Sequence, residues 1–328
     1  MKSRCALLAI VLLSLTVVVR TRGQSDKPKN PPEAQKNPAE TAKNPPEAQK
    51  NPATVPPKLL VLVHQEFKFG KESARDKLSA AISRACDHLA VPNSWIDLQS
   101  ITGPPEALSF DPFDSFEQTG AAFLAWGQLF ASHPELGRMQ EELRALESSE
   151  HTIIAVRRDD LGYRKDRIDL SKARFMRVLE VRLRPGHESN FVDAFKVLGA
   201  AYEKIDADMP WVVYQANVGM PSPSFLVFVP MRALKENDAL LARSSKLREA
   251  EGEEGFQRMQ QIARDAYAST ESNLYAVSPA TSHVSKEFAA GNPEFWSPKP
   301  AASPAQPKVI NPLREPGRRS NPAKQEKQ

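Results

Sequence analysis

The apolar positions of residues 59–161 alternate between strand-like and helix-like spacing in a regular order. The segment LLVLVHQEF (59–67) is rich in branched residues and ends at a turn that contains Gly70, which predicts a strand. Apolar residues then recur at helical spacing until Pro92, and Ser73 is placed to cap that helix. The remaining pattern predicts strands at 94–101, 107–113 and 151–156, with a broken helical region over 116–148.

The same order of elements returns in residues 174–290. Branched and aromatic residues predict strands at 175–183, 211–218, 224–229 and 273–277, and helical spacing occurs over 191–205 and 232–268. Each stretch therefore has the order β-α-β-β-α-β.

The two stretches also match residue by residue. A shift of 116 positions places Glu72-Ser73 on Glu188-Ser189, and it places Trp95 on Trp211 and Gln99 on Gln215. We therefore interpret 58–161 and 174–290 as a tandem duplication joined by a charged connector, 162–173. The predicted fold class is α+β, with two tandem ferredoxin-like units packed sheet to sheet.

The duplication explains one motif that resembles a phosphate-binding loop. FGKES (69–73) and PGHES (185–189) are the strand-to-helix turns of the two units. A phosphate loop needs the pattern G-x-x-x-x-G-K-[ST], in which a hydroxyl follows the lysine. Glu72 stands in that place and the second copy has no lysine, so the motif does not predict phosphate binding.

The unit that opens with RVLEVRLRPGHESNFVDAFK (177–196) resembles the dimeric α/β-barrel superfamily. It is most similar to antibiotic-biosynthesis-monooxygenase-like and NIPSNAP-like domains, and the resemblance covers about 59–285. The resemblance implies two ferredoxin-like sheets around a central cavity. Both sheets come from one chain here, so we expect a monomer with an intramolecular pseudo-dimer. A strand-turn-helix pattern is evidence for a fold far more than for a function.

The first residues have the order of a secretory signal peptide. Lys2 and Arg4 precede an apolar run that ends at Val19, and Gly23 is a small residue at the expected cleavage position. The run is shorter than the roughly 20 residues of a spanning helix. We expect a signal peptide, 1–23, and export to the periplasm or the exterior of a bacterial cell. An uncleaved N-terminal membrane anchor is the alternative.

Two proline-rich segments flank the predicted units. Residues 24–57 repeat KNPPEAQ-like units, and 291–328 form a basic tail with few apolar residues, so both are predicted to be disordered. The remaining 59–290 hold 27 basic and 33 acidic residues, which argues against a nucleic-acid partner. A weak contact with an anionic cell envelope is an option for the tails.

The sequence contains no motif that is specific for one kind of chemistry. The patterns H-E-x-x-H, C-x-x-C and G-x-S-x-G and the Rossmann glycines are absent. The six histidines are scattered without the spacing of metal ligands. We therefore expect no metal and no cofactor.

Strand alternation indicates which side chains would face the cavity that the resemblance implies. Successive residues of a strand point to opposite faces of a sheet, and the less apolar face of each opening strand is assigned to the cavity. The candidate cavity-lining residues are His64, Glu66, Trp95, Gln99, Glu180, Arg182, Trp211 and Gln215. An ordinary ion pair between two packed sheets is the plainer interpretation of the charged ones.

Three functions are compatible with these features. The first hypothesis is an exported, non-catalytic module that binds a small apolar or aromatic ligand or has a structural role. The second is a cofactor-independent monooxygenase or a haem-handling enzyme, because such members of the superfamily use Asn, Trp and His. Residues of those types are present, although at no spacing that matches a family: His64, Trp95, Trp211 and Asn217. The third is an envelope interaction protein that acts through its tails.

Overall fold

The computed structural model describes residues 56–297. The expected signal peptide, 1–23, lies outside the described residues, as do most of the linker, up to residue 55, and the tail from residue 298 onward. Among the described helices, none is both long enough and apolar enough to cross a bilayer.

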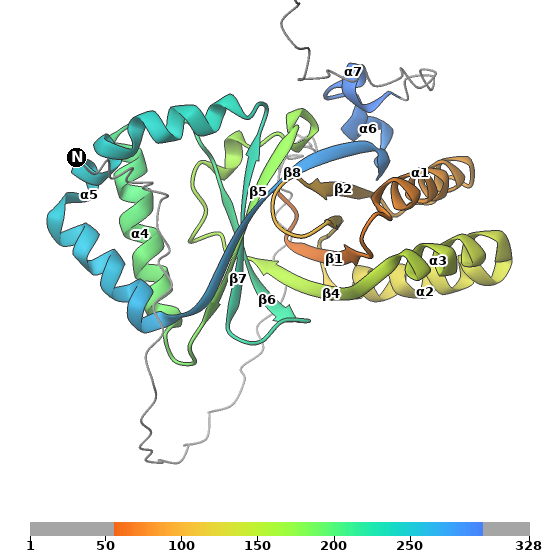
Figure 1. Cartoon of the computed structure of the whole chain (residues 1–328), viewed down its shortest axis with the longest axis horizontal. Coiled ribbons are helices and arrows are strands. Elements are labelled where there is room, and N and C mark those ends of the chain that lie inside the picture. Colours follow the sequence, from red (N-terminus) through yellow and green to blue (C-terminus); the bar gives the residue numbers. More distant parts are fainter. Residues whose placement is uncertain (1–55, 298–328) are drawn as a thin grey trace, which may run out of the picture. The chain divides into compact units, whose positions relative to one another are not determined.

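The first half contains four strands and three helices, in the order that the apolar pattern predicts (Figure 1). The broken helical region forms two separate helices, because Pro134 begins the second of them. The elements are β1 (Leu59–Phe67), α1 (Glu72–His88), β2 (Trp95–Ser100), β3 (Glu106–Phe113), α2 (Phe116–Ser132), α3 (Pro134–Leu146) and β4 (Glu147–Arg157).

The second half repeats this order with one long helix in place of two. That helix is interrupted at Gly252, whose φ of 72° is not helical. The elements are β5 (Phe175–Leu183), α4 (Glu188–Lys204), β6 (Val212–Val218), β7 (Ser224–Met231), α5 (Lys235–Ala266) and β8 (Tyr267–His283). Two short helices follow, α6 (Lys286–Ala289) and α7 (Pro293–Trp296).

The eight strands form one closed antiparallel barrel in the order β1-β3-β2-β8-β5-β7-β6-β4. Within each half the strands are arranged alike, as β4-β1-β3-β2 and as β8-β5-β7-β6. The halves join at two seams, because β2 pairs with β8 and β4 pairs with β6. The expectation of two sheets that only pack face to face is therefore corrected: their edges are hydrogen-bonded to each other.

One seam depends on a glycine. Gly219 follows β6, has a φ of 91°, and lies so close to β4 that an added Cβ would be 2.1 Å from the carbonyl oxygen of Thr152. Any side chain there would push the two strands apart. The absence of a Cβ thus permits the β4–β6 contact that closes the barrel.

The strand-to-helix turns of the two halves have the same backbone conformation. Gly70 and Gly186 have φ values of 75° and 85°, a region that favours glycine. The expected cap is corrected, because α1 begins at Glu72 after an N-cap residue, Lys71, that makes no side-chain cap. Ser73 lies inside the first turn and caps nothing.

The interior of the barrel is apolar over most of its length. Every second residue of each strand points inward, which gives β1 and β5 the inward faces that their alternation predicts. The buried interior includes Leu60, Leu62, Leu98, Leu108, Phe110, Ile153, Ala155, Met176, Val178, Val212, Tyr214, Leu226 and Phe228.

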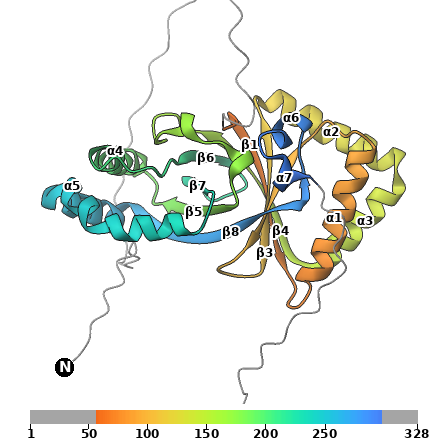
Figure 2. The ribbon, with the colours of Figure 1, turned by 90° about the horizontal axis from the view of Figure 1, so that it is seen from above.

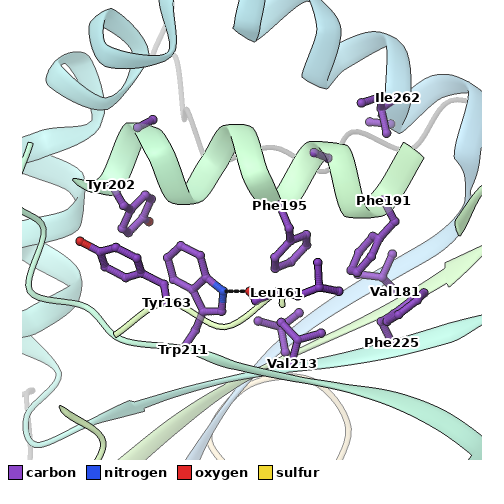
Figure 3. Close-up of a cluster of buried hydrophobic side chains, with 14 of the residues drawn as sticks. Leu161, Tyr163, Val181, Phe191, Phe195, Tyr202, Trp211, Val213, Phe225 and Ile262 are labelled. Atoms are coloured by element: carbon purple, nitrogen blue, oxygen red, sulfur yellow. Dashed lines mark hydrogen bonds between the residues drawn. The ribbon is translucent and has the colours of Figure 1, made fainter. Parts of the chain in front are cut away.

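The helices cover the outer faces of the barrel. Helices α1, α2 and α3 lie on one side and α4 and α5 on the other (Figures 1 and 2). Under α4 the layer is a solid apolar core, in which Phe191 stacks on Phe225 with ring centroids 4.2 Å apart (Figure 3). The indole of Trp211 lies in the same core and donates a hydrogen bond to the carbonyl of Leu161.

The structure corrects one predicted boundary, the start of the tail, and it places the connector within the fold. The connector 162–173 is part of the folded unit, because Tyr163 stacks on Trp211 and Ile168 is buried. The tail does not begin at 291, because α7 packs on the barrel and its Trp296 is buried. In both segments one or two large apolar residues are buried in the core. Because their sequence neighbours are polar, the apolar pattern does not reveal this.

We expect Phe191→Ala to destabilise the protein by about 3–5 kcal/mol, because the site is fully buried and packed on both sides. Urea denaturation measures the change. The control is Phe69→Ala, whose ring is 96% exposed, and that change should stay within about 0.5 kcal/mol. Equal effects of the two substitutions would show that the α4 layer is not the core of this half.

Candidate functional site

The layer under α1, α2 and α3 is not a solid core. A cavity of about 280 Å³ lies there, between the outer face of the first-half sheet and the three helices. Only three buried apolar residues form the accompanying cluster, Ile82, Cys86 and Leu143. The floor of the cavity is largely polar, in contrast to the apolar layer under α4.

The contrast can be followed position by position. The strand ladders fix the equivalences on β2 and β3, since Asp97 pairs with Ser109 as Val213 pairs with Val227. The 116-residue shift gives the others. Six cavity residues, Gln65, Arg75, Ser79, Asp97, Ser109 and Asp111, thus occupy the positions of Val181, Phe191, Phe195, Val213, Val227 and Val229 in the apolar core. Burying polar groups is unfavourable unless they are paired. The six polar residues of this layer are therefore better explained by a function than by a contribution to stability.

A buried ion pair organises this layer. The guanidinium of Arg75 donates from Nη1 and Nη2 to the two carboxylate oxygens of Asp97, at 2.7 and 2.8 Å. Asp97 also accepts hydrogen bonds from Ser109 at 2.9 Å and from Thr281 at 2.5 Å. Both charged side chains are 2% exposed or less. Burial alone would lower the pKa of Arg75, but the charge of Asp97 outweighs it and raises that pKa.

The pair extends to a second carboxyl group through Gln65. Arg75 donates to the side-chain oxygen of Gln65 at 3.1 Å, and the amide nitrogen of Gln65 donates to Glu147 at 2.7 Å. Burial and the nearby charge of Glu150 raise the pKa of Glu147 to about 7. This network therefore contains a group that can exchange a proton near neutral pH.

Asp111 is the carboxyl group of the cavity with no hydrogen-bonding partner among the described side chains. It lies on β3 and lines the cavity. Its side chain is half-buried, because one side of it borders the space of the cavity. Desolvation raises the pKa of Asp111 to about 7, and no neighbouring cation offsets the shift. A carboxyl group with such a pKa can accept or donate a proton at physiological pH.

Aromatic side chains form the opposite wall. Phe123, Trp126 and Phe130 come from α2, and Trp95 comes from the start of β2. The ring centroids of Trp95 and Trp126 are 6.0 Å apart, and those of Trp126 and Phe130 are 5.5 Å apart. An aromatic wall facing a polar floor suits a flat molecule with a polar edge.

A second polar cluster lies inside the barrel. His64 Nε2 is 2.6 Å from a carboxylate oxygen of Glu106, and the hydroxyl of Tyr275 donates to the other oxygen. The ring of His151 lies beside His64, with centroids 4.7 Å apart. The polar residues enclose a cavity of only about 30 Å³, which is the size of one water molecule.

The charges in this cluster act in a consistent direction. Burial by itself lowers the pKa of His64, but the hydrogen bond to Glu106 and the charges of Glu106 and Glu180 raise it overall. The pKa of Glu106 is lowered, because the hydrogen bonds from His64 and Tyr275 outweigh burial. Both shifts favour a charged pair. Burial raises the pKa of Glu180, which faces the same small cavity.

The structure separates the sequence-predicted site residues into three groups. His64 and Glu180 lie together in the small interior cavity. Glu66 is half-buried beyond it, opposite Glu106 on β3, and Arg182 is exposed near the end of β5. The remaining four do not lie in the barrel interior, apart from an edge of Trp95: Trp95, Gln99, Trp211 and Gln215.

The prediction that these four residues line the barrel interior is wrong, because they lie on the outer face of their strands, towards the helices. Gln99 donates to Asp76 of α1 at 2.9 Å, and Gln215 accepts from Arg158 at 2.8 Å. Trp211 is part of the α4 core. Trp95 lines the helix-covered cavity and also the edge of an apolar cavity at one end of the barrel. The set of His64, Trp95, Trp211 and Asn217 is therefore not brought together.

Sequence reasoning missed the polar layer, although a signal for it exists. Identical residues at the 116-residue shift indicate only the similarity of the two halves, whereas the polar layer lies where the halves differ. Arg75 opposite Phe191 and Asp97 opposite Val213 are such differences. Asp111 could be found only once the ladder fixed its equivalence to Val229, because the offset on β3 is 118.

The residues of the helix-covered cavity do not suit a haem. Iron in haem proteins takes His, Cys, Met or Tyr as an axial ligand, and the residues that line this cavity include none of these. Within residues 56–297 no group of three or more His, Cys, Asp or Glu side chains is arranged to hold a metal ion.

No protein-family model matches the chain, and no curated protein matches its sequence. Solved structures do resemble it. An anthrone oxidase-like protein is 13% identical, with a TM-score of 0.47 over 67% of this chain and 91% of its own. A protein named as a monooxygenase from Lactobacillus acidophilus is 8% identical, with a TM-score of 0.42 over 67% and 93%. A mutant chlorite dismutase from Candidatus Nitrospira defluvii is 8% identical, with a TM-score of 0.43 over 70% and 96%.

These proteins are members of the dimeric α/β-barrel superfamily, and the closed eight-stranded barrel of this chain is consistent with that fold. Identities this low concern the fold alone and assign no activity to the chain. The similar structures nevertheless carry the names of oxidase-like, monooxygenase and dismutase proteins. The expectation that put a non-catalytic module first is corrected to this extent: none of the three similar structures is named as such a module.

We expect Arg75→Met alone to destabilise the protein by roughly 3–5 kcal/mol, because Asp97 would be left as a buried, unpaired carboxylate. The double variant Arg75→Met/Asp97→Val should cost clearly less, since it removes both charges and makes position 97 resemble Val213. Denaturation curves measure both variants, with the exposed Arg182→Met as control. A double variant that is less stable than the single one would contradict this account.

We expect NMR titration to place the pKa of His64 above its free value of about 6.5. Glu106→Gln should lower that pKa most, and Glu180→Gln should lower it less, because only Glu106 is hydrogen-bonded. The raised pKa stabilises the fold fully below pH of about 6.5, and this contribution is lost as the pH rises through the folded value. A His64 signal that ignores both substitutions would refute the cluster.

Proposed function

We propose that this protein is a cofactor-independent oxygenase whose active site is the helix-covered cavity of the first half. The observation that carries the proposal is Asp111, an unpartnered carboxyl group that faces an aromatic wall where the other half has a valine. Asp111 is the general base. The substrate is a flat aromatic molecule with an acidic C–H group.

The chemistry requires a proton acceptor and a reducing substrate. Phe123, Trp126 and Phe130 hold the ring of the substrate, and Asp111 takes a proton from its edge. The resulting carbanion is electron-rich and reduces O₂. For a CH₂ group between two rings, one oxygen atom ends as the new carbonyl and the other leaves as water, so that R₂CH₂ + O₂ gives R₂C=O + H₂O.

The Arg75–Asp97 pair holds the floor of this site in place. It ties α1 to β2, and through Ser109 and Thr281 it also fixes β3 and β8. The positive charge of Arg75 is balanced by the carboxylate of Asp97, to which it is hydrogen-bonded, so the guanidinium does not neutralise Asp111. The base therefore keeps the high pKa that proton abstraction near pH 7 requires.

The organisation of the chain is proposed in the same terms. The equal strand order of the halves and their matched ladders support a tandem duplication of ferredoxin-like units, in which one copy carries the site and the other an apolar core. We propose a monomer with a pseudo-dimeric barrel. The order of residues 1–23 supports an exported enzyme, and the proline-rich linker and tail would be disordered spacers around it.

We expect the purified protein to consume O₂ with anthrone in the presence of a chelator, above the rate of spontaneous oxidation. Asp111→Asn should lower kcat/KM by about 10²–10⁴, the usual contribution of a general base. In the wild type kcat/KM should rise with pH and level off above about pH 7. The control Asp114→Asn changes an exposed carboxyl group outside this cavity and should leave activity unchanged.

The stability of Asp111→Asn separates a catalytic role from a structural one. A carboxyl group with a raised pKa destabilises the fold as pH rises from its unfolded value of about 3.9 towards 7. The variant should therefore be at least as stable as the wild type at pH 8. An Asp111→Asn protein with full oxygenase activity, or a wild type without O₂ consumption on anthrone, would overturn the proposal.

A further inference from the structure

The barrel interior contains a second cavity that the proposed reaction does not use. The middle of the barrel is filled by leucine and isoleucine side chains, and its polar end is closed around His64 and Glu106. At the other end a cavity of about 370 Å³ is left unfilled by side chains. This volume is in the range of small-molecule sites, whereas an eight-stranded barrel is otherwise just wide enough for its own side chains.

The wall of this cavity is apolar. Leu60, Phe110, Met176, Val212 and Phe228 come from five different strands, and all are buried. Phe110 meets Phe228 edge to face, with ring centroids 5.0 Å apart. Water in such a space has few partners, so its replacement by an apolar molecule is favourable.

The end of the described chain covers this cavity. Val284, Ser285 and Phe288 line it, at the start of and within α6. The ring of Trp296 packs on Phe288 with centroids 5.2 Å apart, and its indole nitrogen donates to the carbonyl of Ser171 at 2.8 Å. Helices α6 and α7 thus form a cap that shields an apolar space from solvent.

The charged residues at the rim of the cavity do not favour a charged ligand. Arg157 is bound to Asp159 at 2.8 Å and donates to the carbonyl of Pro56. Lys58 and Asp114 are exposed and have opposite signs. A charged ligand would therefore lose its hydration without gaining a buried partner.

Tyr214 supplies a polar atom within the apolar wall. Its hydroxyl donates to the carbonyl of Pro57 at 2.8 Å, which leaves the lone pairs of the oxygen free to accept a hydrogen bond. Burial raises the pKa of Tyr214, so the phenol stays neutral. A ligand with one hydroxyl group matches this acceptor.

We infer that the capped end of the barrel is a binding site for an uncharged, mostly apolar molecule that carries one hydroxyl group, such as a medium-chain alcohol. The site is separate from the helix-covered cavity, and its occupant is not the substrate of the proposed reaction. Only an edge of Trp95 contributes to both cavities.

The test measures displacement of the neutral fluorescent probe N-phenyl-1-naphthylamine from the full protein. We expect saturable binding at one site per chain and displacement by 1-decanol. Its isomer 1-methoxynonane has the same size but no hydroxyl hydrogen, and it should bind several-fold more weakly. Decanoate and decyltrimethylammonium should bind at least tenfold more weakly than 1-decanol, because each would bury an unpaired charge.

Variants locate the site. Val212→Trp should fill the cavity and abolish probe binding, and Leu170→Trp at the less buried edge should do the same if the first variant folds poorly. Tyr214→Phe should keep probe binding but remove the advantage of 1-decanol over its isomer. The control Val218→Trp is on the same strand at an exposed position and should bind as the wild type does.

Several outcomes would overturn the inference. They are the absence of saturable probe binding, unchanged binding in both filling variants, equal affinity for decanoate and 1-decanol, or an unchanged alcohol preference in Tyr214→Phe. None of them bears on Asp111, so failure here is distinguishable from failure of the proposed oxygenase. Conversely, the filling variants should retain O₂ consumption, which is assigned to the other cavity.

Discussion

The hydrogen bonds that join β2 to β8 and β4 to β6 are the constraint on which the rest of this structure depends. Without them each four-stranded sheet would expose two unpaired edges and one apolar face. With them the chain acquires an interior that needs no helix to cover it. The outer faces of the same strands are then the only surfaces left for the helices, and two layers of different chemistry can form on them.

The two layers divide the work of the protein. The layer under α4 contains stacked aromatic rings, and it contributes stability through apolar packing. The layer under α1 contains the Arg75–Asp97 ion pair, which is joined by two hydrogen bonds, and Asp111, which has no such partner. Paired charges can remain buried at modest cost, whereas an unpaired carboxyl group persists only where some function offsets the loss of stability.

Much of the fold could be predicted from the sequence, because strand and helix periods are local properties. The alternation of β1 and β5 indicated the inward position of His64 and Glu180. It failed for Trp95 and Gln99, since alternation defines two faces but not which of them is inside, and polar character was a poor guide. The outward face of β2 is polar because Asp97 binds Arg75, a contact between residues 22 positions apart that no local pattern reveals.

The short segment between the halves has a consequence for how two copies of this chain could assemble. A closed barrel built from two similar halves is open in principle to domain swapping, in which each half closes with a half from another chain. Exchange needs the intervening segment to act as a free hinge. Here the ring of Tyr163 is stacked on Trp211 and packs edge-on against Tyr202, so the hinge is anchored in the core of the second half. Swapping would have to extract a buried aromatic side chain, and the anchored connector therefore favours closure within one chain.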